Sequence, residues 1–218
     1  MISGEDALAR RSGTRAVIIV RVIKIGGSLE NSDKLKKLLD CLLEGGKGQT
    51  VIVPGGGSFA NAVRELQLST GIADEYAHRM ALLAMEQFAW YLTALTPGLQ
   101  TADSLSSIYK CLAENGVALW LPYKMVSSEN SVPASWDITS DSLGAWLALE
   151  IEADSLTLVK SARLPQRYSG WHDLSRQGLV DVYLGNLLQE KDLNVYWLYK
   201  DEYLSILSPS LKTFAVQQ

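Results

Sequence analysis

The stretch "RVIKIGGSLENS" (residues 21–32) ends an apolar, β-branched run with a lysine, Lys24, and two glycines. The stretch "VIVPGGGSFANAVRE" (residues 51–65) repeats this plan with three glycines and no lysine. A β-branched run is typical of a buried strand, and in both stretches glycines interrupt it before a helical pattern begins. Two strands that each lead through glycines into a helix predict βαβ units, which build a parallel sheet.

The rest of the chain continues this alternation of strand and helix patterns. The predicted fold is therefore an α/β domain with a mainly parallel sheet that helices cover on both faces. Residues 1–15 are polar and are expected to form a flexible tail, whereas residues 16–218 are expected to form a single domain. Strands are predicted at 16–25, 50–54, 116–122, 154–160 and 193–199, and helices at 33–44, 58–67, 74–95, 104–115, 140–153 and 178–191.

Composition and charge restrict the classes of function. The chain has 218 residues, of which 47% are hydrophobic and 20% are charged, and its formal net charge is −4. This balance is globular and argues against a nucleic-acid-binding surface, which needs clustered lysine and arginine. No run approaches the about 20 apolar residues that span a bilayer, and the N-terminal apolar run is too short for an export signal. We therefore expect a cytoplasmic protein with no nucleic-acid or membrane partner.

The cysteines and histidines give no sign of a metal site. Cys41 and Cys111 lie in leucine-containing helical patterns without metal-type spacing, so both are expected to be free thiols. His78 and His172 have no accompanying ligands at a recognisable spacing. The sequence therefore predicts no metal ion held by protein side chains.

Three groups of glycine or polar residues follow predicted strands. Lys24 and residues 26–28 stand at the end of the strand predicted at 16–25, and residues 55–58 follow the strand predicted at 50–54. Lys160 ends the strand predicted at 154–160. We expect these groups to converge, because ligands of parallel sheets bind beyond the carboxyl ends of the strands. Glycines let the backbone approach a ligand, a helix with Ser58 as its N-cap attracts anions, and lysine adds positive charge. The combination suits an oligophosphate and the transfer of a phosphoryl group.

Several of these residues also have a simpler interpretation. Lys24 could extend from a strand end into water, and residues 26–27 could form an ordinary turn. Asp141 would be favourable in the first turn of any helix, or it could orient nearby lysines. The loop at 126–135 could be a flap over a site or a surface connection.

A dinucleotide-binding motif is a competing interpretation of the second glycine run. Residues 55–60 satisfy GxGxxA, and Asp74 and Glu75 follow at about the distance expected for a ribose contact. However, the motif falls on the second strand, directly follows Pro54 and leaves Lys24 unexplained. An NAD(P)-binding oxidoreductase is therefore the weaker hypothesis.

Four segments resemble, in order and spacing, the motifs of the amino acid kinase superfamily, which includes acetylglutamate, aspartate, uridylate, carbamate and isopentenyl phosphate kinases. They are "VIKIGGSL" (22–29), "VIVPGGGSFANAVRE" (51–65), "WDITSDSLGAWLA" (136–148) and "LTLVKSA" (156–162). The resemblance spans about residues 17–162. The short length and the segment "AHRMALLAMEQ" (77–87) are most similar to the aminomethylfuran phosphate kinase branch, which is associated with methanofuran-type cofactor synthesis.

The resemblance implies a three-layer αβα sandwich around a mainly parallel sheet of about eight strands. It also implies ATP with Mg²⁺ held mainly by the phosphates, a small anionic acceptor, and a homo-oligomer. The acceptor side is expected at about residues 16–135, and a shortened nucleotide side at about residues 136–218. In this branch the acceptor would be a furfuryl-type monophosphate.

The resemblance further implies roles for individual residues. Lys24 would stabilise the transferring phosphoryl group, Asp141 would position the lysine side chains, and Lys160 is the third catalytic candidate. The residues expected to bind ATP or the moving phosphoryl group are Gly26, Gly27, Ser28, Gly56, Gly57, Ser161 and Arg163. Those expected to bind the acceptor are Gly55, Ser58, Arg64, His78, Trp136 and Asp137.

One departure from the family pattern bears on catalysis. No glycine-rich segment with a second catalytic lysine follows Ala162. Lys160 or Arg163 could take the place of that lysine. Otherwise the chain would be a non-catalytic protein that binds nucleotide or phosphate, or that serves in assembly.

Overall fold

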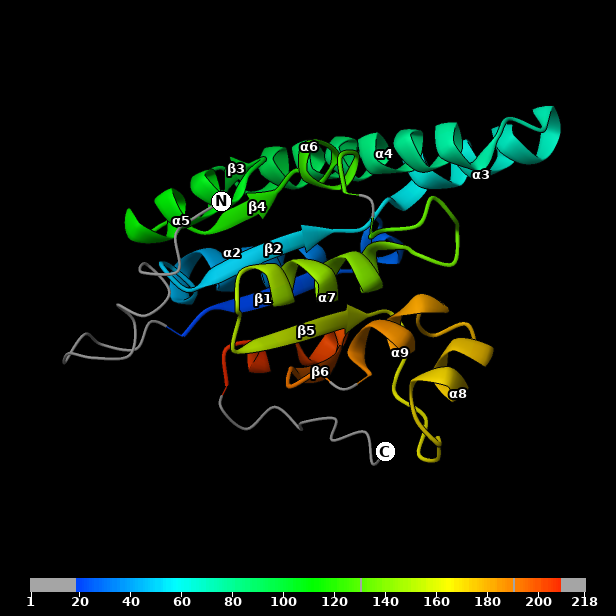
Figure 1. Cartoon of the computed structure of the whole chain (residues 1–218). Coiled ribbons are helices and arrows are strands. Elements are labelled where there is room, and N and C mark those ends of the chain that lie inside the picture. The colour runs from blue at the N-terminus through cyan, green and yellow to red at the C-terminus, as the bar shows by residue number, and fades with distance from the viewer. Residues whose placement is uncertain (1–18, 130, 190, 209–218) are drawn as a thin grey trace.

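The computed structural model describes residues 19–129, 131–189 and 191–208, whose strands form one parallel sheet (Figure 1). The strand order is β3-β4-β2-β1-β5-β6, which places β1 between β2 and β5. The strands are β1 (Arg21–Ile25), β2 (Thr50–Pro54), β3 (Gln100–Ala102), β4 (Ala118–Trp120), β5 (Ser155–Lys160) and β6 (Asn194–Tyr199).

Helices cover both faces of this sheet. Figure 1 shows α7 (Ser140–Glu150) crossing in front of β1 and β5, with α2 (Leu35–Gly45) behind the sheet. The long helices α3 (Gly57–Thr70) and α4 (Asp74–Leu95) pack against each other along the β2 side. The shorter helices are η1 (Gly27–Leu29), α5 (Leu105–Ala113), α6 (Tyr123–Val126), α8 (Trp171–Arg176), α9 (Tyr183–Leu188) and η2 (Lys200–Ser205).

The alternation of side chains along β1 decides which residue faces the site. Ile23 and Ile25 are buried in the core that includes α2, whereas Val22 is buried in the core that includes α7. Because successive side chains of a strand point to opposite faces, Lys24 lies on the α7 face with Val22. Gly144 of α7 passes closely over it, since a Cβ at Gly144 would lie 3.4 Å from Lys24 Cβ. The absence of a larger side chain there lets the helix cover the lysine stem.

The predicted parallel α/β fold is confirmed, but the expected number of about eight strands is wrong for the described residues, which form a six-stranded sheet. The edge strand β3 was not predicted, because its sequence QTA contains no apolar run. The helix predicted over 178–191 is present only as α9, whose N-cap is Val182, and the Leu184 N–H in its first turn donates to Asp181 at 3.0 Å. The short helix α8 was also not predicted.

The expectation that Ser58 caps α3 is wrong. The helix begins at Gly57 with Gly56 as its N-cap, so Ser58 lies in the first turn. Ser58 instead donates its backbone N–H and its hydroxyl to the Glu30 carboxylate, both at 2.7 Å. A carboxylate from a neighbouring turn therefore satisfies the helix start. The expected tail at residues 1–15 lies outside the described residues, and the division near residue 135 remains a prediction.

Candidate functional site

The two glycine turns lie side by side at the carboxyl edge of the sheet. The Gly55 N–H donates to the Ile25 carbonyl at 2.9 Å, which continues the pairing of β1 with β2. A Cβ at Gly27 would overlap the backbone of Gly57, and a Cβ at Gly55 would overlap the backbone of Gly27. The sequence interpretation assigned these glycines to the approach of a ligand. The structure shows that packing also requires glycine at these positions, because a larger residue would prevent the two turns from touching.

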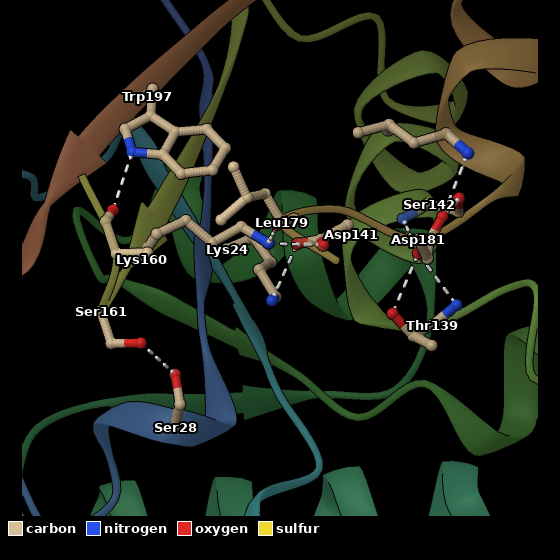
Figure 2. Close-up of polar contacts among 12 residues, drawn as sticks. Lys24, Ser28, Thr139, Asp141, Ser142, Lys160, Ser161, Leu179, Asp181 and Trp197 are labelled. Atoms are coloured by element: carbon tan, nitrogen blue, oxygen red, sulfur yellow. Dashed lines mark hydrogen bonds and ion pairs between the residues drawn. The ribbon is translucent and has the colours of Figure 1, made fainter. Parts of the chain in front are cut away.

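Two lysines and one aspartate meet beneath α7 (Figure 2). Lys24 Nζ lies 2.8 Å from Asp141 Oδ1, and Lys160 Nζ lies 2.5 Å from Asp141 Oδ2. Lys160 also donates to the Leu179 carbonyl at 2.7 Å. The register of β1 on β5 pairs Lys24 with Leu158, so Lys160, two residues further on, faces the same side of the sheet. The strand pairing thus brings both lysines to the first turn of α7.

Lys24 and Asp141 are buried, and Lys160 is only slightly more exposed. The side chains of Lys24, Asp141 and Lys160 are 6%, 5% and 12% exposed. The alternative in which Lys24 extends into water is therefore wrong, whereas both interpretations of Asp141 apply, since it starts α7 and contacts both lysines. In direct contact, two ammonium groups share one carboxylate, so the cluster itself carries one positive charge in excess where the strands end, and Asp181 is a further carboxylate whose charge acts on Lys160. A buried excess charge of this kind is stabilised by an anionic ligand.

The pKa values in this cluster reflect burial opposed by neighbouring charge. Burial raises the pKa of Asp141, but the charges of Lys24 and Lys160 outweigh that effect and hold it below the usual aspartate value. Burial and the Lys24 charge lower the pKa of Lys160 to about 8, although Asp141 opposes the shift. The Lys160 ammonium is thus close to releasing its proton at mildly alkaline pH.

A cavity of about 460 Å³ opens beside the glycine turns, and its lining comes from η1, α3, α4 and the start of α7. At one part of this lining the Arg64 guanidinium lies 4.4 Å from the ring centre of Trp136, whose indole N–H donates to Gln67 at 2.5 Å. Burial lowers the pKa of His78, which favours its neutral form. The predicted residues that line the cavity are Gly27, Ser28, Gly56, Gly57, Ser58, Arg64, His78 and Trp136.

The remaining predicted residues lie around this cavity rather than in its lining. Gly26 and Gly55 belong to the turns, and Ser161 shares a hydrogen bond of 2.9 Å with Ser28 across the edge of the sheet. Asp137 is exposed, and its carbonyl accepts the Tyr183 N–H at 3.0 Å, so the structure shows a backbone contact and no pocket contact for it.

Arg163 lies apart from the lysine cluster. Its guanidinium pairs with Glu202 at 3.0 Å and stacks over Tyr199 at 4.1 Å. Lys160 and Arg163 are the two candidates to replace the second catalytic lysine of the family pattern. Of these two residues, Lys160 lies beside Lys24 and Arg163 does not.

The GxGxxA motif has a packing role in this structure. A Cβ at Gly56 would overlap Ala60 of the same helix, and Gly55 contacts the other glycine turn. Asp74, considered for a ribose contact, accepts a hydrogen bond from Gln67 at 2.7 Å at the start of α4. These contacts account for the motif without a dinucleotide.

Sequence reasoning missed two carboxylates of the site. Glu30 lines the cavity and binds the first turn of α3, and Asp181 binds the first turn of α7 through Thr139 and Ser142. Glu30 stands in the first quoted stretch, residues 21–32, and Asp181 stands inside the segment predicted as helix, 178–191, two residues before α9 begins. Their partners are distant in sequence, so no local pattern reveals the contacts.

The described residues, 19–129, 131–189 and 191–208, have neither a metal-binding cluster nor a membrane-spanning helix. Within that part of the chain, no three histidine, cysteine, aspartate or glutamate side chains gather closely enough to hold a metal ion. None of its helices combines the length and apolar character needed to cross a membrane.

The comparisons with known proteins agree with this geometry. The family model described as "Amino acid kinase family" matches residues 20–163. The chain is 33% identical over 130 residues to the [5-(aminomethyl)furan-3-yl]methyl phosphate kinase of Methanocaldococcus jannaschii. That alignment covers 59% of this chain and 59% of the relative, less than two thirds of either.

Solved structures share the fold at low sequence identity. The uridylate kinase of Archaeoglobus fulgidus superposes with a TM-score of 0.66 at 15% identity, over 88% of this chain and 97% of that one. The UMP kinase of Ureaplasma parvum gives 0.64 at 19% identity, over 89% and 97% of the two chains. At such identities the likeness concerns the fold alone.

Proposed function

Because the chain belongs to the amino acid kinase family, we propose that it is an ATP-dependent kinase that transfers the γ-phosphoryl group to a small anionic acceptor. The observation that carries this proposal is the cluster of Lys24, Asp141 and Lys160. Its excess positive charge lies at the edge of the sheet where the glycine turns meet, and phosphoryl transfer depends chiefly on positioning and charge neutralisation.

The cavity supports a small acceptor. Its volume of about 460 Å³ suits a compact molecule, and the stacked Arg64 and Trp136 offer a cation and a flat apolar surface. The name of the M. jannaschii relative specifies [5-(aminomethyl)furan-3-yl]methyl phosphate, which combines an anion with a flat ring. The acceptor proposed for this chain is accordingly a furfuryl-type phosphate monoester, as in methanofuran-type cofactor synthesis.

The residues around the lysine cluster fit an ATP triphosphate. Lys24 and Lys160 would neutralise charge on the moving phosphoryl group, while Asp141 holds both ammonium groups in place. The turn at Gly26 to Ser28 and the Ser161 hydroxyl would contact the phosphates of ATP. Mg²⁺, when bound, would neutralise further phosphate charge and would be held mainly by the phosphates. Arg163, engaged with Glu202, has no role in this proposal.

The chemistry needs no general base. The second pKa of a phosphate monoester is about 6, so an acceptor oxygen is already anionic near neutral pH. That oxygen would attack the γ-phosphorus, the bond from the γ-phosphorus to the bridging oxygen of ATP would break, and ADP would leave. The product is a diphosphate. Charge neutralisation by the two lysines would then be the main contribution of the protein to the rate.

A phosphorus NMR assay with ATP, Mg²⁺ and a panel of phosphate and carboxylate acceptors tests the proposal. We expect new diphosphate or acyl phosphate signals together with ADP. Calorimetric binding of ATP without transfer to any acceptor would support the non-catalytic alternative. Binding of NAD(P) in preference to ATP would support an oxidoreductase.

Exposed apolar side chains support the proposal of a homo-oligomer. Several lie on the paired helices, Leu66 and Leu68 on α3 and Tyr76, Leu83 and Trp90 on α4. Large apolar side chains on paired helices commonly mark contact surfaces. Light scattering that shows a monomer at micromolar concentration would contradict this assembly. The cytoplasmic location remains a prediction.

A further inference from the structure

A short segment that follows Lys160 in the chain contacts both the Lys160 side chain and the backbone at the start of α7. We call residues 179–184, which end in the first turn of α9, the strap. At its start the Leu179 carbonyl accepts the Lys160 ammonium at 2.7 Å. Near its end the Tyr183 N–H donates to the Asp137 carbonyl at 3.0 Å, beside the start of α7. The strap lies beyond residues 20–163, the part of the chain that the family model matches.

Asp181, in the middle of the strap, binds the first turn of α7 (Figure 2). Its Oδ2 accepts the backbone N–H groups of Thr139 and Ser142 and the Thr139 hydroxyl, each at 2.9 Å. Its Oδ1 accepts the Ser142 hydroxyl and, at 3.0 Å, the Leu184 N–H. One carboxylate therefore satisfies donors of α7 and of α9 at the same time.

The residue held between these donors is Asp141. It lies between Thr139 and Ser142, so the backbone that Asp181 fixes on both sides is the backbone that carries the Asp141 carboxylate. The strap also carries the Leu179 carbonyl, which accepts another hydrogen bond from the Lys160 ammonium. A shift of the strap would therefore change two of the contacts that hold Lys160.

Charge couples the same groups. The groups that act on Lys160 are Asp141 from α7, Lys24 from β1 and Asp181 from the strap, and the Asp181 charge raises the pKa of Lys160. Burial and the nearby Asp141 carboxylate raise the pKa of Asp181, while its hydrogen bonds from Ser142 and Thr139 oppose that shift. An uncharged residue at position 181 would thus remove a negative charge that favours the protonated form of Lys160.

We propose that Asp181 is a positioning residue, which ties the strap to the first turn of α7 and so holds Asp141 and the Leu179 carbonyl around Lys160. This inference rests on the proposed kinase function for its kinetic consequence. The strap, which lies after the residues that the family model matches, would then position the ion cluster in addition to packing against the rest of the fold. Asp181 itself touches neither reacting group.

The test compares Asp181→Asn with Asp154→Asn in the full chain. Asp154 accepts the Val20 N–H at 2.6 Å at the opposite edge of the sheet, so its variant also removes a carboxylate that binds backbone. For Asp181→Asn we expect kcat to fall by about tenfold to a hundredfold, since small displacements of catalytic groups cost that much. The KM for the acceptor should change little, and the alkaline limb of the rate profile should move to lower pH. Asp154→Asn should not change the pH at which the rate falls on the alkaline side of the profile.

A second readout does not depend on catalysis. Carbon-13 labelling of the lysine ε-methylene groups allows the Lys160 titration to be followed by NMR, and we expect it at lower pH in Asp181→Asn than in the wild type. If the wild type transfers no phosphoryl group but this titration shifts, the proposed function fails and the positioning role stands. A kcat within twofold of an active wild type, or an unchanged titration, would overturn the inference.

If Asp181→Asn does not fold, Thr139→Val removes one donor to the same carboxylate and serves in its place. We expect a smaller loss of kcat of at least threefold, because the Thr139 hydroxyl is one of several donors to Asp181. A folded Thr139→Val protein with wild-type kcat would contradict the positioning role.

Discussion

The Lys160 ammonium lies 2.5 Å from Asp141 Oδ2 and joins the end of β5 to the first turn of α7. The other oxygen of the same carboxylate contacts Lys24 at 2.8 Å, so the cluster contains two positive charges and one negative charge. Its position beside the glycine turns connects the fold to the proposed phosphoryl transfer. The expected effects of changing these residues follow from that charge balance.

Lys24→Met should abolish most of the activity while the protein remains folded. Methionine has a similar length and leaves Asp141 paired with Lys160, so the buried charges balance. Loss of a charge that stabilises the transition state should lower kcat by roughly 10²-fold or more. Steady-state kinetics with Lys36→Met as control measures this, because Lys36 pairs with Asp40 on the solvent-facing side of α2. Equal turnover in the two variants would remove Lys24 from the mechanism.

Asp141→Asn should destabilise the protein strongly. Two buried ammonium groups would lose their counter-charge, and breaking a buried ion pair costs about 3–5 kcal/mol. Urea unfolding followed by circular dichroism gives the free energy of unfolding, with Asp40→Asn as the matched control, because the Asp40 carboxylate pairs with Lys36 on the solvent-facing side of α2. A phosphate-containing buffer should recover part of the loss, since phosphate can neutralise the lysines. A variant as stable as the control would show that the cluster does not depend on Asp141.

The pH dependence of stability should carry the signature of Lys160. Its pKa is lowered to about 8 in the folded protein, against 10.5 as the usual value for lysine. Between these values the unfolded chain binds more protons, so the Lys160 contribution to the free energy of unfolding should rise with pH from about 8 to 10.5. Below pH 8 its destabilising effect is complete. Urea unfolding across this range should show the free energy of unfolding of the wild type rising relative to that of Lys160→Met. A difference between the two proteins that stays constant with pH would contradict the lowered pKa of Lys160.

ATP binding should be linked to proton uptake by the same group. Anionic phosphates favour the charged form of Lys160, so a fraction of the lysines that is neutral at pH 8 should become protonated on binding. Calorimetry at pH 8 in buffers of different ionisation enthalpy measures the number of protons. Uptake that persists unchanged in Lys160→Met would exclude this lysine as its source.

Gly27→Ala tests the contact between the glycine turns. The added methyl group would overlap the backbone of Gly57, which cannot move without shifting the start of α3. We expect lower stability and a loss of activity larger than the loss of stability alone explains. Gly45→Ala is the control, because its methyl group would meet only the Leu207 side chain. Wild-type behaviour of Gly27→Ala would show that the turns tolerate separation.

The sequence predicted the elements that carry the site better than the contacts within it. Lys24 and Lys160 could be located because each ends a β-branched run, and parallel strands end at one edge. The strand period of two and the register of β1 on β5 then place both side chains under α7. Asp141 was identified with the aid of the family resemblance.

The contacts of Glu30, Asp181 and Ser28 could not be predicted because they join distant parts of the chain. Glu30 binds Ser58, 28 residues away, Asp181 binds Thr139, 42 residues away, and Ser28 meets Ser161, 133 residues away. Such pairs depend on how the turns pack, which local patterns do not encode. The edge strand β3 escaped prediction for a related reason, since its three residues gain their conformation from pairing with β4.

The central claim is tested most directly by transfer of labelled phosphate from [γ-³²P]ATP to [5-(aminomethyl)furan-3-yl]methyl phosphate in the presence of Mg²⁺. Wild-type protein and Lys24→Met, purified identically, are compared at equal concentrations. We expect label in a diphosphate product with the wild type and a roughly 10²-fold slower rate with Lys24→Met. Binding of ATP without transfer of label to this or any other phosphate or carboxylate acceptor, or equal rates with both proteins, would contradict it.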